Sequence, residues 1–474
     1  MFPQAQEPVT YEPAKSMSHR PDDLRPMALI RPRNLLGFAK TRTGVLGLTT
    51  IGNLIVRTIS SVLLTRLLRP YDFGIVGIIT SVFFVVTLVT DLGFQDFVIR
   101  HERTADRHFR DVIWTIHAKR GAALAVVVAA ASPAIAWAFG KSVLTLPLAV
   151  ASLIFLINGL ASLSLMTALR HDKSRELSLL EFGLQAFQTV ACLLLALWWR
   201  NLWAMIGAML LQSALRSLLS YTLFSDSAQR PARDRALARE FFAFSRIVLM
   251  SSAMALLIGQ SDKLILGRLF TLPEFGLYAI AVTIASAPWG FAESYINRIV
   301  FPIYALIWRE APGELPTVYY RARRTTSALY AFGCGGLIGS AALVVAILYD
   351  PRYAPAATFI SLLMIGVAMR LPNAAATQLM VAIGHVGRTP QITFARLLWV
   401  ISMIPVGFIF FGPIGVVTAM GLIEVPATLY CWVLLRRVGV LDLRKEVAFL
   451  ALIATGATIG FVGETAILRL FPHL

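Results

Sequence analysis

The sequence predicts an all-α polytopic membrane protein with 12 core transmembrane helices in two six-helix lobes, followed by a thirteenth apolar segment. Of its 474 residues, 57% are hydrophobic and 15% are charged, which leaves too little polar surface to cover a water-soluble core. Apolar stretches of about 20 residues, the length that crosses a bilayer core of about 30 Å, recur along the chain. The basic residues lie mainly between these stretches, and an internal repeat divides the core stretches into two halves.

The first 45 residues differ from the rest of the chain. They contain six prolines and seven Lys or Arg, and no apolar stretch that resembles a signal peptide. Segments of this composition cannot bury enough apolar surface to fold alone. We therefore expect residues 1–45 to form a disordered, basic cytoplasmic tail.

The apolar stretches follow at regular intervals and predict the helices in order. They are residues 46–68, 73–95, 118–139, 143–166, 178–199, 201–224, 246–268, 273–298, 326–349, 353–378, 392–411, 413–435 and 447–470. Accordingly, 46–224 is expected to be the N-terminal lobe, 225–245 a cytoplasmic linker, and 246–435 the C-terminal lobe. Residues 436–474 would add a cytoplasmic loop and the extra helix, which Glu464 interrupts.

The basic residues predict the orientation. Lys and Arg accumulate on the cytoplasmic side of membrane proteins. The tail and the loops on its side, with the helix ends beside them, hold 30 Lys or Arg, against six on the other side. We therefore predict a multi-pass membrane protein with a cytoplasmic N-terminus. The same asymmetry accounts for the net charge of +17 without a nucleic-acid partner.

A short motif occurs twice. RLLRPYDFGIVGI begins at Arg66 and RLFTLPEFGLYAI begins at Arg268, so the pattern R-L-x-x-x-x-[DE]-F-G repeats after 202 residues. Each copy joins one predicted helix to the next, and six helices separate the copies. Because six is even, both halves enter the membrane in the same direction, which predicts pseudo-two-fold symmetry about the membrane normal.

These motifs carry a family resemblance. The junction that starts at Arg66, the later DLGF from Asp91, and the stretch QSDKLILGRL from Gln260 with FGLY from Phe275 resemble the polysaccharide transport (Wzx-like) flippases. This family belongs to the multidrug, oligosaccharidyl-lipid and polysaccharide exporter superfamily. The resemblance implies two lobes around a central cavity, a location in the bacterial inner membrane, and translocation of a polyprenyl-diphosphate-linked oligosaccharide toward the periplasm. Because its members commonly have 12 or 14 helices, the count of 13 departs from the family.

Polar residues at helical spacing predict a cavity. They form one-sided stripes on the first, seventh and tenth segments, and a cation within the membrane needs water, a partner or a substrate. The residues expected to bind substrate are Arg57, Lys263, Arg370, Asn53, Gln260 and Asn373. Ser60 and Ser61 share the face of Arg57. Cations suit a diphosphate, which concentrates negative charge.

An interhelical ion pair is the alternative for each of these cations. Asp262 and Glu424 are the candidate acids, either for such a pair or for coupling to ion flow, although the sequence names no partner for Glu424. Arg216, Arg298 and Arg396 lie toward cytoplasmic helix ends, where snorkelling to the headgroups would explain them.

Other functional classes fit less well. No connection is long enough for a catalytic domain, the seven histidines form no metal-binding pattern, and no P-loop occurs, so we expect neither an enzyme nor a cofactor. A multidrug antiporter of the same superfamily remains an alternative, but it would need cavity-facing acids for cationic drugs. A membrane-embedded polysaccharide polymerase or ligase is a further alternative, and it would need larger periplasmic loops. Polymerase and export proteins are the expected partners, besides membrane lipids.

Overall fold

The computed structural model describes residues 42–170, 173–223, 228–259 and 261–470, and these are almost entirely helical. The helices of the first half are α2 (Arg42–Leu67), α3 (Pro70–Val89), α4 (Phe94–Arg100), α5 (Arg107–Phe139), α6 (Thr145–Ala151), α7 (Leu153–Gly159), α8 (Ser164–Arg170), α9 (Ser174–Trp199) and α10 (Leu202–Thr222). Those of the second half are α11 (Arg235–Gly259), α12 (Ser261–Leu269), α13 (Leu272–Tyr295), the π-helix η5 (Ile296–Val300), α14 (Phe301–Glu310), α15 (Leu315–Arg321), α16 (Arg324–Gly339), α17 (Ala341–Leu348), α18 (Ala356–Ala382), α19 (Thr389–Gly421), α20 (Glu424–Arg437) and α21 (Leu443–Leu470).

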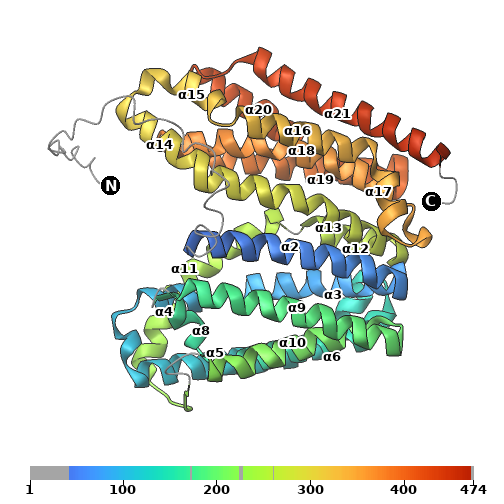
Figure 1. Cartoon of the computed structure of the whole chain (residues 1–474). Coiled ribbons are helices and arrows are strands. Elements are labelled where there is room, and N and C mark those ends of the chain that lie inside the picture. Colours follow the sequence, from blue (N-terminus) through green and yellow to red (C-terminus); the bar gives the residue numbers. More distant parts are fainter. Residues whose placement is uncertain (1–41, 171–172, 224–227, 260, 471–474) are drawn as a thin grey trace.

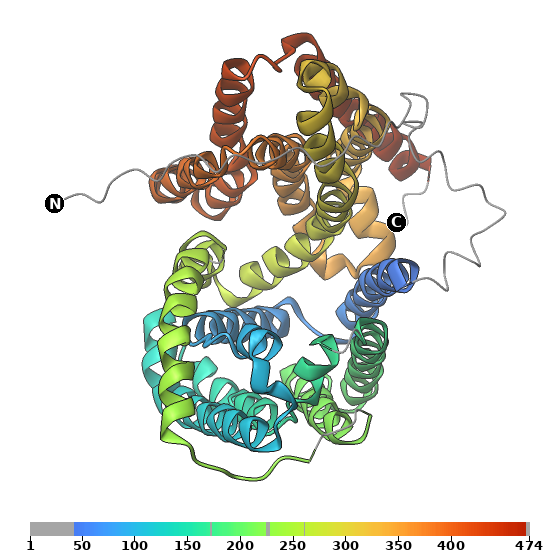
Figure 2. The same cartoon turned by 90° about the vertical axis from the view of Figure 1, so that its left-hand side faces the viewer.

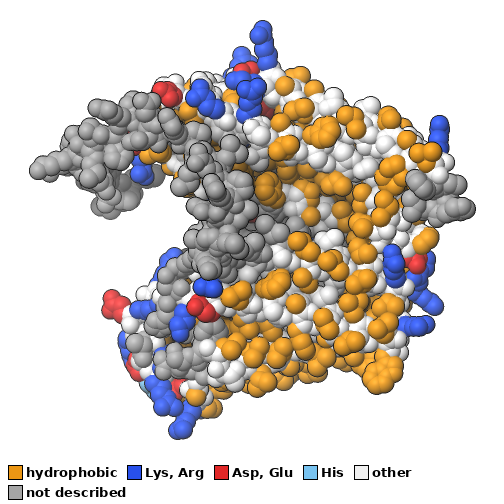
Figure 3. Space-filling view, in the orientation of Figure 1, with side chains coloured by type: hydrophobic (Ala, Val, Ile, Leu, Met, Phe, Trp, Pro, Cys, Tyr) orange, Lys and Arg blue, Asp and Glu red, His pale blue; other side chains and the backbone are white. Residues whose placement is uncertain are grey.

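The helices form two lobes, as predicted. Helices α2 to α10 make the lower bundle of Figure 1, and α13 to α21 make the upper one. Figure 2 shows α11 and α12 running between the two bundles. The beginning of α11 packs on the first lobe, where its Leu237 and Phe241 join a buried cluster with Phe94 and Phe109. In Figure 3, hydrophobic side chains cover the middle of the molecule and charged ones gather toward its two ends, as in a membrane-spanning protein.

Length and composition identify most of the spans directly. Nine helices of the described residues are long and apolar enough to cross a membrane, or ten if the bent pair α16 and α17 counts as one. That pair turns by 72° at its break. The first predicted segment corresponds to α2, and the seventh corresponds to α11 together with α12. These helices are not among the nine.

The longest apolar helix is in fact a hairpin. Gly412 has φ 59° and ψ −142°, a conformation that breaks the helix and that glycine adopts without strain. Trp399 Nε1 donates a 2.8 Å hydrogen bond to the carbonyl oxygen of Ala419, whereas 20 residues of continuous helix would separate them by about 30 Å. The chain therefore reverses at Gly412, and the eleventh and twelfth predicted segments are two helices.

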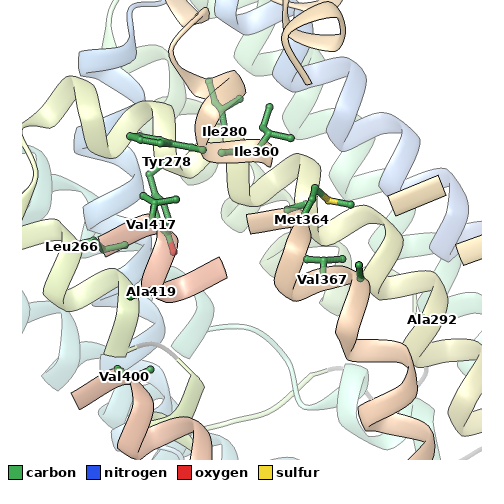
Figure 4. Packing of buried hydrophobic residues seen from close by; sticks show 14 of the residues in the cluster. Leu266, Tyr278, Ile280, Ala292, Ile360, Met364, Val367, Val400, Val417 and Ala419 are labelled. Carbon is green, nitrogen blue, oxygen red and sulfur yellow. The ribbon is translucent and has the colours of Figure 1, made fainter. Parts of the chain in front are cut away.

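Most of the buried apolar core lies in the second lobe and at its junction with the first. Figure 4 shows part of it, where Leu266, Tyr278, Met364 and Val417 come from four different helices. Because lipid is as apolar as these side chains, close packing stabilises such a core more than exclusion of water does.

The repeated motif makes the same local structure in both lobes. At the start of α3, the Asp72 carboxylate accepts a hydrogen bond from the backbone N–H of Arg69 at 3.1 Å. At the start of α13, the Glu274 carboxylate accepts one from the backbone N–H of Thr271 at 2.8 Å. The acid of the motif thus satisfies an unpaired N–H at a helix start in each copy, which explains why the motif needs it.

The motif glycines lie where the lobes meet. A Cβ added to Gly74 would lie 1.9 Å from the carbonyl oxygen of Leu272, and a Cβ added to Gly276 would lie 1.9 Å from that of Pro70. Both pairs are related by the offset of 202 residues, so the contact is reciprocal, as at a two-fold axis. The pseudo-two-fold arrangement is therefore visible in the contact itself. We call this end of the molecule the junction end, and the end with the basic loops the basic end.

Helix α21, the thirteenth predicted segment, packs closely along α16. Gly335 and Gly339 of α16 face Gly456 and Gly460 of α21, with each backbone against the other. Small residues four apart let membrane helices approach in this way. Glu464, which weakened the prediction of this segment, accepts hydrogen bonds from the backbone N–H groups of Ala342 and Leu343 at 2.9 and 3.1 Å. Its carboxylate thus satisfies two backbone N–H groups at the start of α17, directly after the bend.

Candidate functional site

A polar pocket of about 380 Å³ lies between the lobes, next to the junction end. We call it the central pocket. Helices α2, α3, α9, α10, α12 and α13 line it. Its polar lining residues include Arg57, Ser60, Ser61, Lys263, Gln185, Gln188, Thr80 and Thr283.

Two of the predicted cations meet in this pocket. Arg57 comes from the first segment and Lys263 from the seventh, so the structure brings together residues 206 positions apart in the chain. Within the part of the chain that the structure describes, neither forms a salt bridge or a hydrogen bond. Among the described residues, no carboxylate therefore competes with an anionic ligand for these two cations. The described lining contains no Asp or Glu.

The remaining predicted residues of the first and seventh segments lie differently. Ser60 and Ser61 line the pocket beside Arg57, as their spacing predicted. Asn53 is half-buried outside the lining, and its buried Oδ1 has no partner among the described residues. Gln260 and the side chain of Asp262 lie outside the described residues.

Helix α9 contributes polar groups that the sequence analysis did not select. Gln185 and Gln188 line the pocket at a spacing of three residues, and Thr189 follows them. Their spacing on one helical face is the same signal that identified Arg57, but it is weaker because neither glutamine is charged. Amide groups donate and accept hydrogen bonds, as recognition of sugar hydroxyls requires.

The predicted cation of the tenth segment lies in a separate cluster within the second lobe. Arg370 Nε lies 3.4 Å from Glu424 Oε1, and Arg396 Nη2 lies 2.7 Å from Glu424 Oε2. Asn373 donates to the same Oε2 at 2.9 Å, and the Arg370 guanidinium also lies over the ring of Trp289. The acid is buried, with 4% of its side chain exposed.

This cluster gives Glu424 the partners that the sequence did not name. Arg396 is paired with a buried acid, so the ion pair explains its position where snorkelling was expected. Arg370 and Asn373 are likewise engaged with Glu424, and neither lines the central pocket. The cluster retains one excess positive charge, and 36% of the Arg370 side chain is exposed.

A second pocket, of about 490 Å³, lies within the first lobe and shares Thr80 with the central pocket. His117, Asn158 and Arg120 contribute polar groups to it. Arg120 donates to Thr90 Oγ1 at 2.9 Å, and His117 Nδ1 lies 3.0 Å from the carbonyl oxygen of Gly159. These side chains hold helix ends and backbones together, so the pocket offers fewer free groups than the central one.

Two basic side chains hold the lobes together at the junction end. Lys141 of the first lobe donates to the carbonyl oxygen of Gly267 at 2.7 Å. Arg352 of the second lobe donates to the carbonyl oxygen of Thr65 at 3.4 Å. The two carbonyls are again 202 residues apart, so each lobe binds the equivalent point of the other. We call these two contacts the junction clasps.

Neighbouring groups shift the pKa of Lys141 and orient the side chain of Arg352 in the clasps. Burial lowers the pKa of Lys141, and the nearby Arg268 lowers it further, while Glu274 raises it. The hydrogen bond from the Arg352 side chain lowers the pKa of Asp350, so this carboxylate stays charged and orients the guanidinium. Tyr353 adds a hydrogen bond to the carbonyl oxygen of Leu68 at 3.0 Å.

Comparison with known families agrees with this architecture. The family model described as "Polysaccharide biosynthesis protein" matches residues 63–358, which is more than half of the chain. The chain belongs to this family. The matched region contains both copies of the repeated motif, the central pocket residue Lys263 and both junction clasps.

Solved structures share the fold. The lipid II flippase MurJ in an inward closed conformation is similar with a TM-score of 0.67 and 12% identity, over 88% of this chain and 91% of that one. An inward-facing multidrug resistance MATE family transporter of the MOP superfamily is similar with a TM-score of 0.59 and 13% identity, over 81% of this chain and 94% of that one. No curated protein matches the sequence. These structures confirm the expected fold, and the family match confirms the expected polysaccharide family. The two neighbours are described as a flippase and a transporter.

Proposed function

We propose that this membrane transporter is a flippase for polyprenyl-diphosphate-linked oligosaccharides, used for exopolysaccharide, lipopolysaccharide or capsule synthesis. One observation carries the proposal: Arg57 and Lys263 line one pocket without a carboxylate partner among the described residues. Cationic donors suit a diphosphate, and the planar guanidinium of arginine binds its oxygens in pairs.

The rest of the pocket suits the sugar. Gln185 and Gln188 supply amide groups beside the two cations. The polar head cannot cross hydrocarbon unaided, so the pocket needs only to shelter the head while the polyprenyl tail stays in lipid. Movement of one lobe against the other would then expose the pocket to each side in turn.

A multidrug antiporter is the second candidate, because the MATE transporter shares the fold. Cationic drugs need acidic groups in their binding site. The described lining of the central pocket has two cations and no Asp or Glu, which favours an anionic substrate. Loss of resistance to cationic dyes on deletion, with normal polysaccharide export, would favour the antiporter.

Replacement of Arg57 tests the proposal. Hydrogen bonds to charged groups contribute about 1.5 to 3 kcal/mol, so Arg57→Ala should reduce transport of the lipid-linked sugar about tenfold to a hundredfold. Arg57→Lys keeps the charge but loses the planar fork, and should reduce it less. Transport is measured as polysaccharide export in cells and as substrate movement in proteoliposomes.

Arg309→Ala is the control, because Arg309 is exposed at the end of α14, outside the repeated motif, and does not line the pocket. It should leave transport unchanged. Membrane abundance is measured for all variants. Normal export by an abundant Arg57→Ala protein would contradict a role in substrate binding.

The proposal includes an inner-membrane location with a cytoplasmic N-terminus, which rests on the distribution of Lys and Arg. Reporters fused after residues 110 and 235 should report the cytoplasm, and reporters fused at 141 and 352 should report the periplasm. The opposite pattern would reverse the orientation and the direction of transport.

A further inference from the structure

A third pocket lies at the basic end, on the second lobe. It shares no lining residue with the central pocket. Its volume is about 920 Å³, and it is formed where α20 turns into α21, beside the start of α15. We call it the α20–α21 pocket. Its lining includes Leu429, Trp432, Val433, Arg436, Leu443 and Arg444.

The base of this pocket is firmly held. Arg323 and Glu446 form a salt bridge at 3.1 Å, with 4% of each side chain exposed. Trp432 Nε1 donates to the other oxygen of Glu446 at 3.3 Å, and the backbone N–H of Asp442 donates to the Tyr320 hydroxyl at 3.0 Å. These contacts tie the ends of α15, α20 and α21 together, so the pocket exists before any ligand binds.

The rim is cationic. Arg436 and Arg444 are exposed, and among the described residues neither side chain has an ion-pair partner. Lys445 is the exception, because it pairs with Asp442 at 3.0 Å and lies over the Tyr320 ring. Two guanidinium groups therefore remain for an anionic ligand. In Figure 3, Lys and Arg gather over the region where α21 begins.

Below the rim, the pocket is apolar and open. Leu429, Val433 and Leu443 have 55%, 45% and 55% of their surface exposed. Leu429, Val433 and Arg436 follow i, i+4, i+7 spacing and share one face of α20. The rise between Leu429 and Arg436 is about 10 Å, so one end of the pocket lies at headgroup level and the other reaches the acyl region.

From this juxtaposition of two unpaired arginines and an exposed apolar wall, we propose that the α20–α21 pocket binds an anionic phospholipid of the bilayer. The phosphate would lie between Arg436 and Arg444, and an acyl chain would lie along Leu429 and Val433. Basic pockets between helices at the membrane surface bind lipid headgroups in this way. A water-soluble phosphate would leave the apolar wall uncovered, and the two pockets share no lining residue, so the transported substrate does not account for this one.

Lipid titration of the purified full-length protein tests the proposal. Native mass spectrometry in detergent would count bound phosphatidylglycerol and phosphatidylcholine over a concentration series. The wild type should retain phosphatidylglycerol selectively. An arginine that contacts the lipid phosphate at the membrane surface contributes about a fivefold gain in affinity, so the double variant R436Q/R444Q, which removes both contacts, should lose about 25-fold.

Arg437→Gln is the matched control, because Arg437 is exposed, adjacent to Arg436 and absent from the pocket lining. It removes one charge from the same surface but no contact of the pocket, so it should leave lipid selectivity unchanged. All three positions are on the surface, and thermal unfolding of each variant checks that the fold is intact. Unchanged selectivity in R436Q/R444Q, or an equal loss in Arg437→Gln, would overturn the proposal.

Other ligands give distinct results. Competition by glycerol 3-phosphate or inorganic phosphate as strong as by phosphatidylglycerol would identify a phosphate site that needs no lipid. Preferential retention of undecaprenyl phosphate would identify a substrate site. A dimer that disappears in R436Q/R444Q, with lipid binding unchanged, would identify a protein interface. Each of these outcomes would replace the phospholipid assignment.

Discussion

The two lobes agree at the junction end and differ in the membrane interior. At the junction, the capping acids, the motif glycines and the carbonyls that accept the clasp hydrogen bonds occur in pairs at the same offset of 202 residues. In the interior, the first lobe presents Arg57 to the central pocket, whereas Arg370 of the second lobe is bound to Glu424. The shared structure holds the lobes together, whereas the difference between them leaves Arg57 available to ligand and Arg370 engaged by Glu424.

This difference shows that similar sequence signals lead to two physical outcomes. Arg57 and Arg370 both lie on polar stripes of apolar helices, and both need compensation for their charge. Arg370 obtains it from an acid 54 residues away, which also binds Arg396. Arg57 obtains none from the described residues and faces a pocket. Removal of Glu424 should therefore lower stability, whereas removal of Arg57 should lower transport.

The largest effect is expected at Glu424. Removal of one member of a buried ion pair leaves uncompensated charge and costs about 3 to 5 kcal/mol, so Glu424→Ala should strongly lower the thermal stability and membrane abundance of the protein. Glu424→Gln keeps hydrogen-bonding capacity and should be less damaging. Glu293→Ala, at an exposed acid, is the control. A stable and abundant Glu424→Ala protein would contradict a structural role for the cluster.

The motif glycines should show effects of intermediate and equal size. A methyl group at Gly74 or Gly276 would overlap a backbone carbonyl, and overpacking of this kind costs about 1 to 3 kcal/mol. Gly290→Ala is the control for Gly276→Ala, because it lies on the same helix with no atom within 4 Å of the added Cβ. Thermal unfolding measures all three. Clearly unequal losses at Gly74 and Gly276 would break the proposed equivalence of the lobes.

The junction clasps should have the smallest effects. Lys141→Ala removes one hydrogen bond between the lobes, and Arg352→Ala removes two long ones, to the carbonyl oxygens of Thr65 and Arg66 at 3.4 Å. Each loss should be worth about 1 kcal/mol, so the population open at the junction end should rise about fivefold. Lys141 should matter more, because its contact is shorter. The measurement is the labelling rate of a cysteine at Ser60 by an impermeant reagent, with Arg200→Ala as the control. A rate unchanged in both variants would show that the clasps do not restrain opening.

The helices and the symmetry were predicted well, because both depend on patterns that can be read directly along the chain. Apolar length located the helices, including the eleventh and twelfth on either side of Gly412, and the repeated motif located the two-fold contact. Helical spacing also placed Ser60 and Ser61 beside Arg57. Ion pairs and hydrogen bonds between different helices leave no such pattern in the sequence. Nothing near Glu424 in the sequence indicates Arg370 or Arg396, and nothing near Glu464 indicates the start of α17.

The glycine contact at the junction has a consequence for the speed of opening. Gly74 and Gly276 meet through backbone atoms alone, so this surface has no rotamers to rearrange when the lobes part and return. A gap of about 0.5 to 1 Å already removes about a quarter to a half of the dispersion energy between the two backbones, so this attraction acts mainly when the lobes are fully seated. The glycine contact should therefore favour the closed junction over a narrow range of separation, and any slow step of opening should come from the side chains of Lys141, Arg352 and Tyr353.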